Sequence, residues 1–198
     1  MRALRRVPAA VHALLTDEDS AAKLAPVAKR QDFLLFKGPG ENVLRRYCLA
    51  AEFYAVSRVV RATGDNPLVS AALAASLLKQ HAQKELDLSH FVGMPLGTGV
   101  EAVESAALRK AELESTCAYE HEHLTTYLYR HHEHFKVAHL PCPPACRLPA
   151  ARVTLDTESD YHLISRIFDD LYRGEPLEAE DVVGWFRKNP DFCESAAV

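Results

Sequence analysis

Apolar and polar positions alternate in two rhythms along the chain, and each rhythm predicts one kind of element. Short apolar runs predict strands at 10–16, 33–37, 57–63, 88–92, 135–140 and 152–155. Longer stretches with apolar positions three or four residues apart predict helices at 19–30, 42–54, 67–86, 100–110 and 119–132. Two further helices, 159–172 and 179–188, close the chain. Because predicted strands and helices alternate along the chain, the pattern predicts βα units and a mostly parallel sheet.

The length and composition fit this α/β interpretation. The chain has 198 residues, of which 48% are hydrophobic and 25% charged, so it can bury one sizeable core. We expect residues 1–198 to form a single domain, with 159–198 as a helical segment that closes it.

Charge and cysteine content restrict the environment and the partners. The formal net charge of -4 gives no overall basic field for binding nucleic acid. The five cysteines are an odd number, and no charged-then-apolar export leader precedes them, which indicates a reducing compartment. No apolar run approaches the length of a membrane span. We therefore expect a cytoplasmic protein without nucleic-acid or membrane partners.

Two aspartates carry the first chemical signal. Asp65 in RATGDNP (61–67) and Asp156 in RVTLDT (152–157) each follow an apolar run of β type. Carboxylates at the carboxyl ends of buried strands can hold a divalent cation over a nucleotide, because ligands gather at those ends. Mg²⁺ commonly takes only one or two carboxylates, so this pair is sufficient. The pair predicts a nucleotidyltransferase type of site.

Structural roles are open for the same residues. Asp65 could cap a helix that starts at Pro67, and Asp156 could cap one that starts before Ser159. Arg61, within a predicted strand, could be an ordinary ion-pair partner.

Histidines crowd the stretch 119–134 and raise the alternative of a zinc site. Ligands on one helix need spacings of three or four residues, whereas His121 and His123 point to different faces. No H-E-x-x-H order is present, so a polar helix face is favoured and a histidine-bound metal is a minor hypothesis.

Four segments then occur in a characteristic order: GENVLRRY (40–47), RATGDNP (61–67), EHEHLT (120–125) and VTLDTESDY (153–161). This combination resembles the cytidylyltransferases of the spore-coat polysaccharide biosynthesis protein F type, which are relatives of the synthetases of CMP-activated acidic sugars. The resemblance extends from about residue 11 to residue 192. It implies a nucleotide-diphosphosugar transferase fold with a Rossmann-like sheet. The implied reaction transfers CMP from CTP to a sugar or sugar acid in surface polysaccharide biosynthesis.

The resemblance also implies roles for single residues. Asp65 and Asp156 would be the Mg²⁺ ligands, and no other catalytic residue is implied. The implied nucleotide-binding residues are Arg61, Thr63 and Gly64, and the implied substrate-binding residues are Glu101, Glu122 and His123. For Glu101 a structural alternative is open, because a helix N-terminus attracts carboxylates without any substrate.

Members of this family open with a strand and a basic loop of the pattern Q-A-R-x-x-S-x-R-L-P-x-K. We find no such loop in residues 1–198, so we expect a fold that is truncated at the N-terminus and weak turnover by these residues alone. The alternative is a non-catalytic relative that acts as a binding or structural partner. The oligomeric state is open, and the resemblance allows a homodimer.

Overall fold

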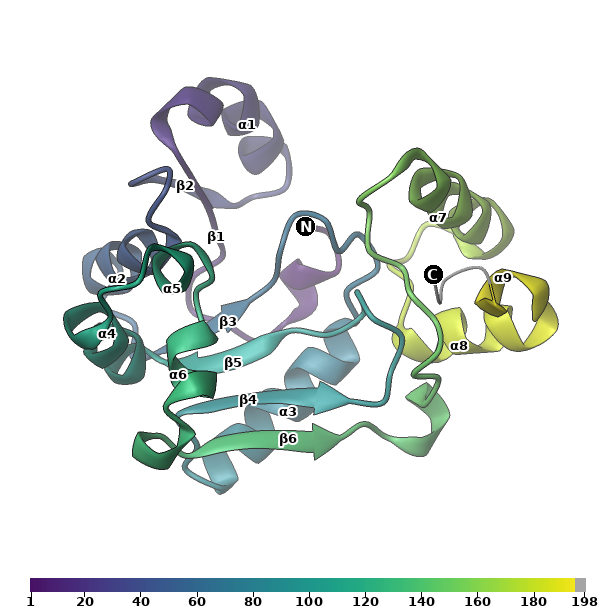
Figure 1. Ribbon diagram of the computed structural model, residues 1–198. Coiled ribbons are helices and arrows are strands. Elements are labelled where there is room, and N and C mark those ends of the chain that lie inside the picture. Colours follow the sequence, from purple (N-terminus) through teal and green to yellow (C-terminus); the bar gives the residue numbers. More distant parts are fainter. Residues whose placement is uncertain (195–198) are drawn as a thin grey trace.

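The computed structural model describes residues 1–194, and its centre is a four-stranded mixed sheet (Figure 1). The strand order is β3 (Arg58–Arg61), β5 (Glu101–Glu104), β4 (Leu88–Val92) and β6 (Val137–Pro141). β5 is antiparallel to both neighbours, whereas β4 and β6 are parallel. β3, β4 and β6 therefore run in the same direction. The α/β class predicted from the sequence is confirmed.

A second, two-stranded parallel sheet stands apart from the first. It pairs β1 (Ala13–Thr16) with β2 (Leu34–Lys37), and α1 (Glu18–Arg30) connects them. Asp17 caps α1 by accepting a hydrogen bond from the backbone N–H of Ser20 at 2.7 Å. We call β1, α1 and β2 the N-terminal lobe. In Figure 1 this lobe stands above the left end of the main sheet, over α2 (Val43–Phe53).

Helices cover both faces of the main sheet. α3 (Ala71–Gln83) lies on the far face in Figure 1, where Leu77 packs with Phe91. On the near face, α4 (Ser105–Glu114) and α6 (Thr126–Arg130) bury Leu108 and Leu128 against Leu88. The short α5 (Ala118–Glu122) precedes α6. Apolar side chains on both faces make the sheet the interior layer of the molecule.

The last three helices of the described chain pack together in a separate apolar cluster, which also includes residues from earlier loops. These helices are α7 (Glu158–Leu171), α8 (Ala179–Lys188) and α9 (Asp191–Glu194). Trp185 and Phe186 of α8 pack with Leu68 and Val153, so this cluster contacts both the loop after β3 and the segment before α7. Single turns of 3₁₀ helix lie at Leu4–Arg6, His132–His134 and Pro144–Cys146. None of the helices within residues 1–194 has the length and apolar character needed to cross a membrane.

The prediction of a helix at 100–110 is wrong for its first residues, because 101–104 form β5. The reason is charge pairing across strands. In the β3–β5 register Arg58 lies opposite Glu104 and Arg61 lies opposite Glu101, and each pair forms a salt bridge. Between these charged ends, Ala102 and Val103 are fully buried in the sheet. Tertiary pairing therefore overrides a local sequence that suits a helix.

Three other predictions need correction. The predicted strand 152–155 makes only a single bridge, between Arg152 and Leu96. The helix predicted at 67–86 begins at Ala71, because the Ser70 side chain caps it. The helix predicted at 119–132 is divided into α5, α6 and a 3₁₀ turn.

Candidate active site

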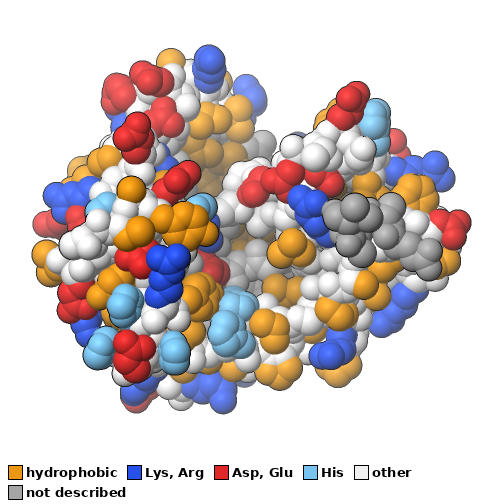
Figure 2. Space-filling view, viewed as in Figure 1, with side chains coloured by type: hydrophobic (Ala, Val, Ile, Leu, Met, Phe, Trp, Pro, Cys, Tyr) orange, Lys and Arg blue, Asp and Glu red, His pale blue; other side chains and the backbone are white. Residues whose placement is uncertain are grey.

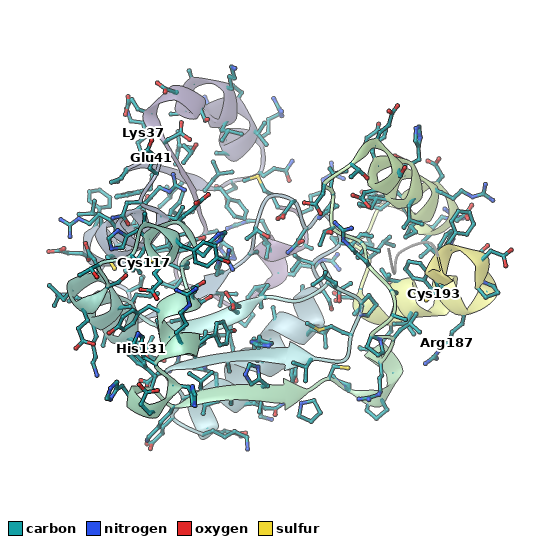
Figure 3. The ribbon with its side chains drawn as sticks, in the orientation of Figure 1. Lys37, Glu41, Cys117, His131, Arg187 and Cys193 are labelled. Carbon is teal, nitrogen blue, oxygen red and sulfur yellow. The ribbon has the colours of Figure 1, made fainter. Side chains whose placement is uncertain are left out.

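A hollow lies between the N-terminal lobe and the α7–α9 cluster. Figure 2 shows it in the middle of the molecule, with acidic side chains gathered along its α7 side. Figure 3 places Lys37 and Glu41 on the N-terminal-lobe side, and Arg187 and Cys193 far across on the α8–α9 side. The loop after β3 and the segment before α7 lie between the N-terminal lobe and the α7–α9 cluster in the ribbon of Figure 1.

The structure brings the two predicted metal-binding segments side by side. The backbone N–H of Leu155 donates a hydrogen bond to the backbone oxygen of Asp65 at 2.7 Å. Asp156 is the next residue, and both aspartates are exposed to solvent. Two segments about 90 positions apart in the chain therefore touch at Asp65 and Leu155.

Asp65 sits in a turn that leaves its carboxylate free. Within this turn Asn66 donates to Thr63 twice, from its backbone N–H to the carbonyl oxygen at 3.2 Å and from Nδ2 to Oγ1 at 2.9 Å. The Asp65 side chain has no hydrogen bond or ion pair with any of residues 1–194. Because Ser70 is the cap of α3, the capping alternative for Asp65 is wrong. Its carboxylate is available to a ligand.

Asp156 also does not cap a helix, although its carboxylate is engaged. The cap of α7 is Thr157, which forms a capping box with Asp160. The Asp156 carboxylate instead pairs with the guanidinium of Arg152, which also lies 3.9 Å from Asp160. The capping alternative is therefore wrong for Asp156 as well.

The donor set fits Mg²⁺ better than a transition metal. Two exposed carboxylates supply hard oxygen ligands, and Mg²⁺ completes its shell with water and phosphate oxygens. Zinc sites instead need three or four protein ligands. In the part of the chain that the structure describes, no group of three or more His, Cys, Asp or Glu side chains is arranged to hold a metal.

Arg61 and Glu101, predicted to bind nucleotide and sugar, meet in one ion pair. Arg61 Nη1 lies 2.8 Å from Glu101 Oε2, and the two side chains are 27% and 17% exposed. The ion-pair alternative for Arg61 is thus confirmed, while Glu101 lies in a strand and not at a helix N-terminus. Tyr47 of α2 lies nearby: burial raises the pKa of its phenol, and the neighbouring Arg61 acts in the opposite direction.

Sequence reasoning missed the residues that surround Glu101. Its carboxylate also accepts hydrogen bonds from Thr125 Oγ1 at 3.1 Å and Tyr129 Oη at 2.7 Å. Tyr129 in turn contacts His90, and His90 contacts His139. A usable signal was present, because His90 and His139 stand at corresponding positions of the adjacent strands β4 and β6.

Glu122 and His123 lie at the end of α5 and are exposed. The His123 ring packs on Tyr119 with 4.2 Å between ring centroids. No hydrogen bond or ion pair joins either side chain to Glu101 within residues 1–194, although Thr125, two residues further, does reach it. Their substrate-binding role stays a prediction.

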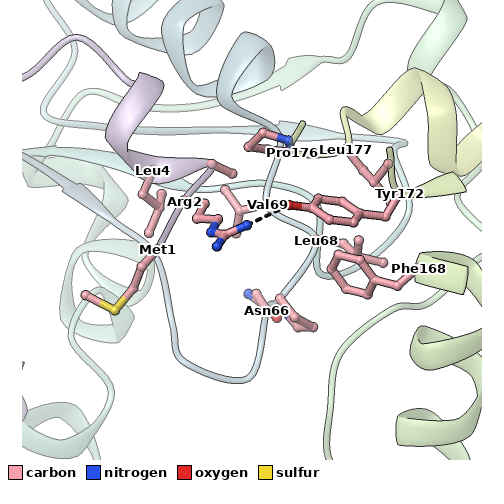
Figure 4. A pocket seen from close by; sticks show the side chains of 12 residues that line it. Met1, Arg2, Leu4, Asn66, Leu68, Val69, Phe168, Tyr172, Pro176 and Leu177 are labelled. Carbon is pink, nitrogen blue, oxygen red and sulfur yellow. Dashed lines mark hydrogen bonds between the residues drawn. The ribbon is translucent and has the colours of Figure 1, made fainter. Parts of the chain in front are cut away.

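A separate cavity of about 310 Å³ adjoins the Asp65 turn (Figure 4). Asn66, Leu68, Phe168 and Tyr172 are among its lining residues. At one side Arg2 Nη1 donates to Tyr172 Oη at 2.6 Å. The walls are mainly apolar, so this cavity suits a highly charged ligand poorly.

Acidic residues gathered in the loops at the carboxyl ends of strands are typical of α/β proteins that act on nucleotides. The sequence matches the cytidylyltransferase family over residues 2–180, and the chain belongs to that family. It is 29% identical over 163 residues to the spore coat polysaccharide biosynthesis protein SpsF of Bacillus subtilis (strain 168), covering 82% of this chain and 68% of that protein.

Two further proteins are similar to this chain. The uncharacterized protein MJ1063 of Methanocaldococcus jannaschii is 30% identical over 159 residues, which are 79% of this chain and 64% of that protein. The chain thus spans less than two thirds of the length of this second relative. The structure of a cytidylyltransferase from Leptospira borgpetersenii serovar Hardjo-bovis (strain JB197) superposes with a TM-score of 0.82 at 24% identity, covering 90% of this chain and 76% of that one. This likeness shows a shared fold.

Proposed function

We propose that the protein transfers CMP from CTP to a sugar or sugar acid in polysaccharide biosynthesis. The observation that carries the proposal is the hydrogen bond from Leu155 to Asp65, which joins the two acidic segments. Membership of the cytidylyltransferase family supports the reaction class, and the similarity to the spore coat polysaccharide biosynthesis protein SpsF supports the biosynthetic context.

In the proposed reaction a sugar hydroxyl attacks the α-phosphorus of CTP. The new bond joins the sugar oxygen to the α-phosphorus, the bond from that phosphorus to the bridging oxygen breaks, pyrophosphate leaves, and the hydroxyl proton passes to water. Asp65 and Asp156 would hold Mg²⁺, which supplies neutralisation of phosphate charge when bound. In the resting structure Arg152 neutralises Asp156, so we expect this pair to loosen when the metal binds.

Features of Gly64 and Arg61 support their proposed nucleotide-binding role. Gly64 has open space where a side chain would stand, so a nucleotide can approach the backbone of the turn. Arg61 uses Nη1 for Glu101, which leaves its other guanidinium donors for a phosphate or a ribose hydroxyl. We assign Thr63 to the nucleotide, and Glu101, Glu122 and His123 to the acceptor sugar.

The test is release of pyrophosphate from CTP in the presence of Mg²⁺ and a panel of sugars and sugar acids, with UTP and ATP as competing nucleotides. Asp65→Asn should abolish Mg²⁺-dependent release. Asp169→Asn is a matched control, because Asp169 is exposed on α7 and its carboxylate has no partner within residues 1–194. Nucleotide binding without release would favour the non-catalytic alternative, and no preference for CTP would contradict the proposed substrate.

A further inference from the structure

Four side chains from four elements form a continuous hydrogen-bond chain that ends at Glu101. Glu101 Oε1 and Tyr129 Oη are 2.7 Å apart, and Tyr129 Oη and His90 Nδ1 are 2.6 Å apart. His90 Nε2 and His139 Nδ1 are 3.1 Å apart. His139 is exposed, whereas Glu101 is mostly buried, so the chain runs from the surface to the Arg61–Glu101 pair. Figure 2 shows histidine side chains grouped below the hollow, over the β4–β6 part of the sheet.

We propose that Tyr129 and His90 are positioning residues for Glu101, and that His139 fixes the tautomer of His90 that makes this possible. The inference rests on the proposed function only for its consequence in catalysis. The hydrogen-bond arrangement itself follows from the donors and acceptors present.

The direction of every hydrogen bond follows from the carboxylate. Glu101 is paired with the Arg61 guanidinium, and a carboxylate can only accept, so the single hydroxyl hydrogen of Tyr129 must point to Glu101. The Tyr129 oxygen is then the acceptor for His90, which must carry a hydrogen on Nδ1. A neutral His90 accepts at Nε2, and the only partner there within residues 1–194 is His139 Nδ1. All donors therefore point inward, toward Glu101.

The local environment supports these protonation states. Burial raises the pKa of Tyr129, and the adjacent Glu101 carboxylate adds to the effect, so the phenol keeps its hydrogen. Burial lowers the pKa of His90, with Glu101 opposing and His139 reinforcing the change, which favours a neutral ring at neutral pH. The Tyr129 and His139 rings are also stacked, with 14° between their planes, so the three rings hold one another in place.

Fixing Glu101 matters for the proposed reaction because this carboxylate would orient the acceptor hydroxyl. Tyr129→Phe removes one donor to a charged group, which is worth roughly a tenfold change in an equilibrium constant. We expect KM for the acceptor sugar to rise about tenfold in this variant, with little change in KM for CTP. His90→Leu should act in the same direction, whereas His90→Asn should recover most of the loss because its amide can donate to Tyr129.

The matched control is His162→Gln. His162 is 72% exposed on α7, and its nearest charged partner is Glu158 at 3.8 Å. Its kinetics should equal those of the unmodified protein. If Tyr129→Phe and His90→Leu also behaved like the control in an active enzyme, the positioning role would be refuted.

Two readouts require no turnover and so separate this inference from the proposed function. Nitrogen-15 NMR of the histidine rings should show His90 with its hydrogen on Nδ1 and a bare Nε2, and His139→Gln should disturb that state. A crystal structure of Tyr129→Phe should show the Glu101 carboxylate rotated away from its present position. A hydrogen on Nε2 of His90 with a bare Nδ1, or an unmoved Glu101 in the variant, would overturn the proposal even if CMP transfer were confirmed.

Discussion

Gly97 lies against the backbone of Val153, in the segment that precedes Asp156, and its substitution gives the sharpest stability prediction. Its φ of +99° is unfavourable for any residue with a side chain. A Cβ at this position would lie 2.9 Å from both the carbonyl carbon and oxygen of Val153, which are backbone atoms and cannot move alone. Shifting them would strain two backbone hydrogen bonds, from Leu96 to Ala151 at 2.9 Å and from Val153 to Leu96 at 2.8 Å.

We expect Gly97→Ala to lower the free energy of unfolding by about 3–5 kcal/mol, of which about 1–3 is backbone strain and the rest is weakened hydrogen bonding. The control is Gly174→Ala, because Gly174 has a nearly equal φ of +101° and open space around a Cβ. It should lose only the strain. The assay is urea unfolding followed by circular dichroism. The free energies of unfolding of the two variants can be compared directly if their m-values are equal. If both variants lost the same free energy of unfolding, the close contact between Gly97 and Val153 would contribute nothing to stability.

Three other predictions test the frame around the site. Glu104→Gln should destabilise the fold by about 1–3 kcal/mol, because Glu104 joins Arg58 and His81, whereas the exposed Glu18→Gln should stay within about 0.5 kcal/mol in thermal unfolding. Burial lowers the pKa of His81, so as the pH falls the unfolded chain binds the extra proton first. The free energy of unfolding should therefore fall as the pH drops below about 6.5, and His81→Asn should flatten that slope. A disulfide reagent at pH 8 should label the exposed Cys117 rapidly and Cys48 only on unfolding, because burial raises the pKa of Cys48 to about 12; fast labelling of Cys48 in the folded protein would contradict its placement.

Periodicity in the sequence was sufficient for the α/β class and for most elements, because long amphipathic helices and apolar strands have distinct repeats. It failed at β5, where a short Ala- and Glu-containing segment becomes a strand between β3, which supplies opposite charges in register, and β4. It also could not reveal that Arg61 and Glu101 would pair, since their contact depends on that register.

The predicted site shows the same division between local and tertiary information. Asp65 and Asp156 were identified from their positions after apolar runs, and the structure places their segments in contact. The chain through Tyr129, His90 and His139 depends on side chains that meet across separate elements. No spacing rule within one element could have predicted it.

In the proposed active site, Asp65 and Asp156 hold one cation next to a nucleotide. The most direct measurement is Mn²⁺ binding, used as a probe for the Mg²⁺ site and followed by electron paramagnetic resonance with and without CTP, for the unmodified protein and for Asp65→Asn, Asp156→Asn and the control Asp169→Asn. We expect CTP to strengthen Mn²⁺ binding and either site variant to weaken it at least tenfold. Both variants should keep the thermal stability of the control. Unchanged binding in both site variants, or loss of binding in one variant only, would contradict a shared site.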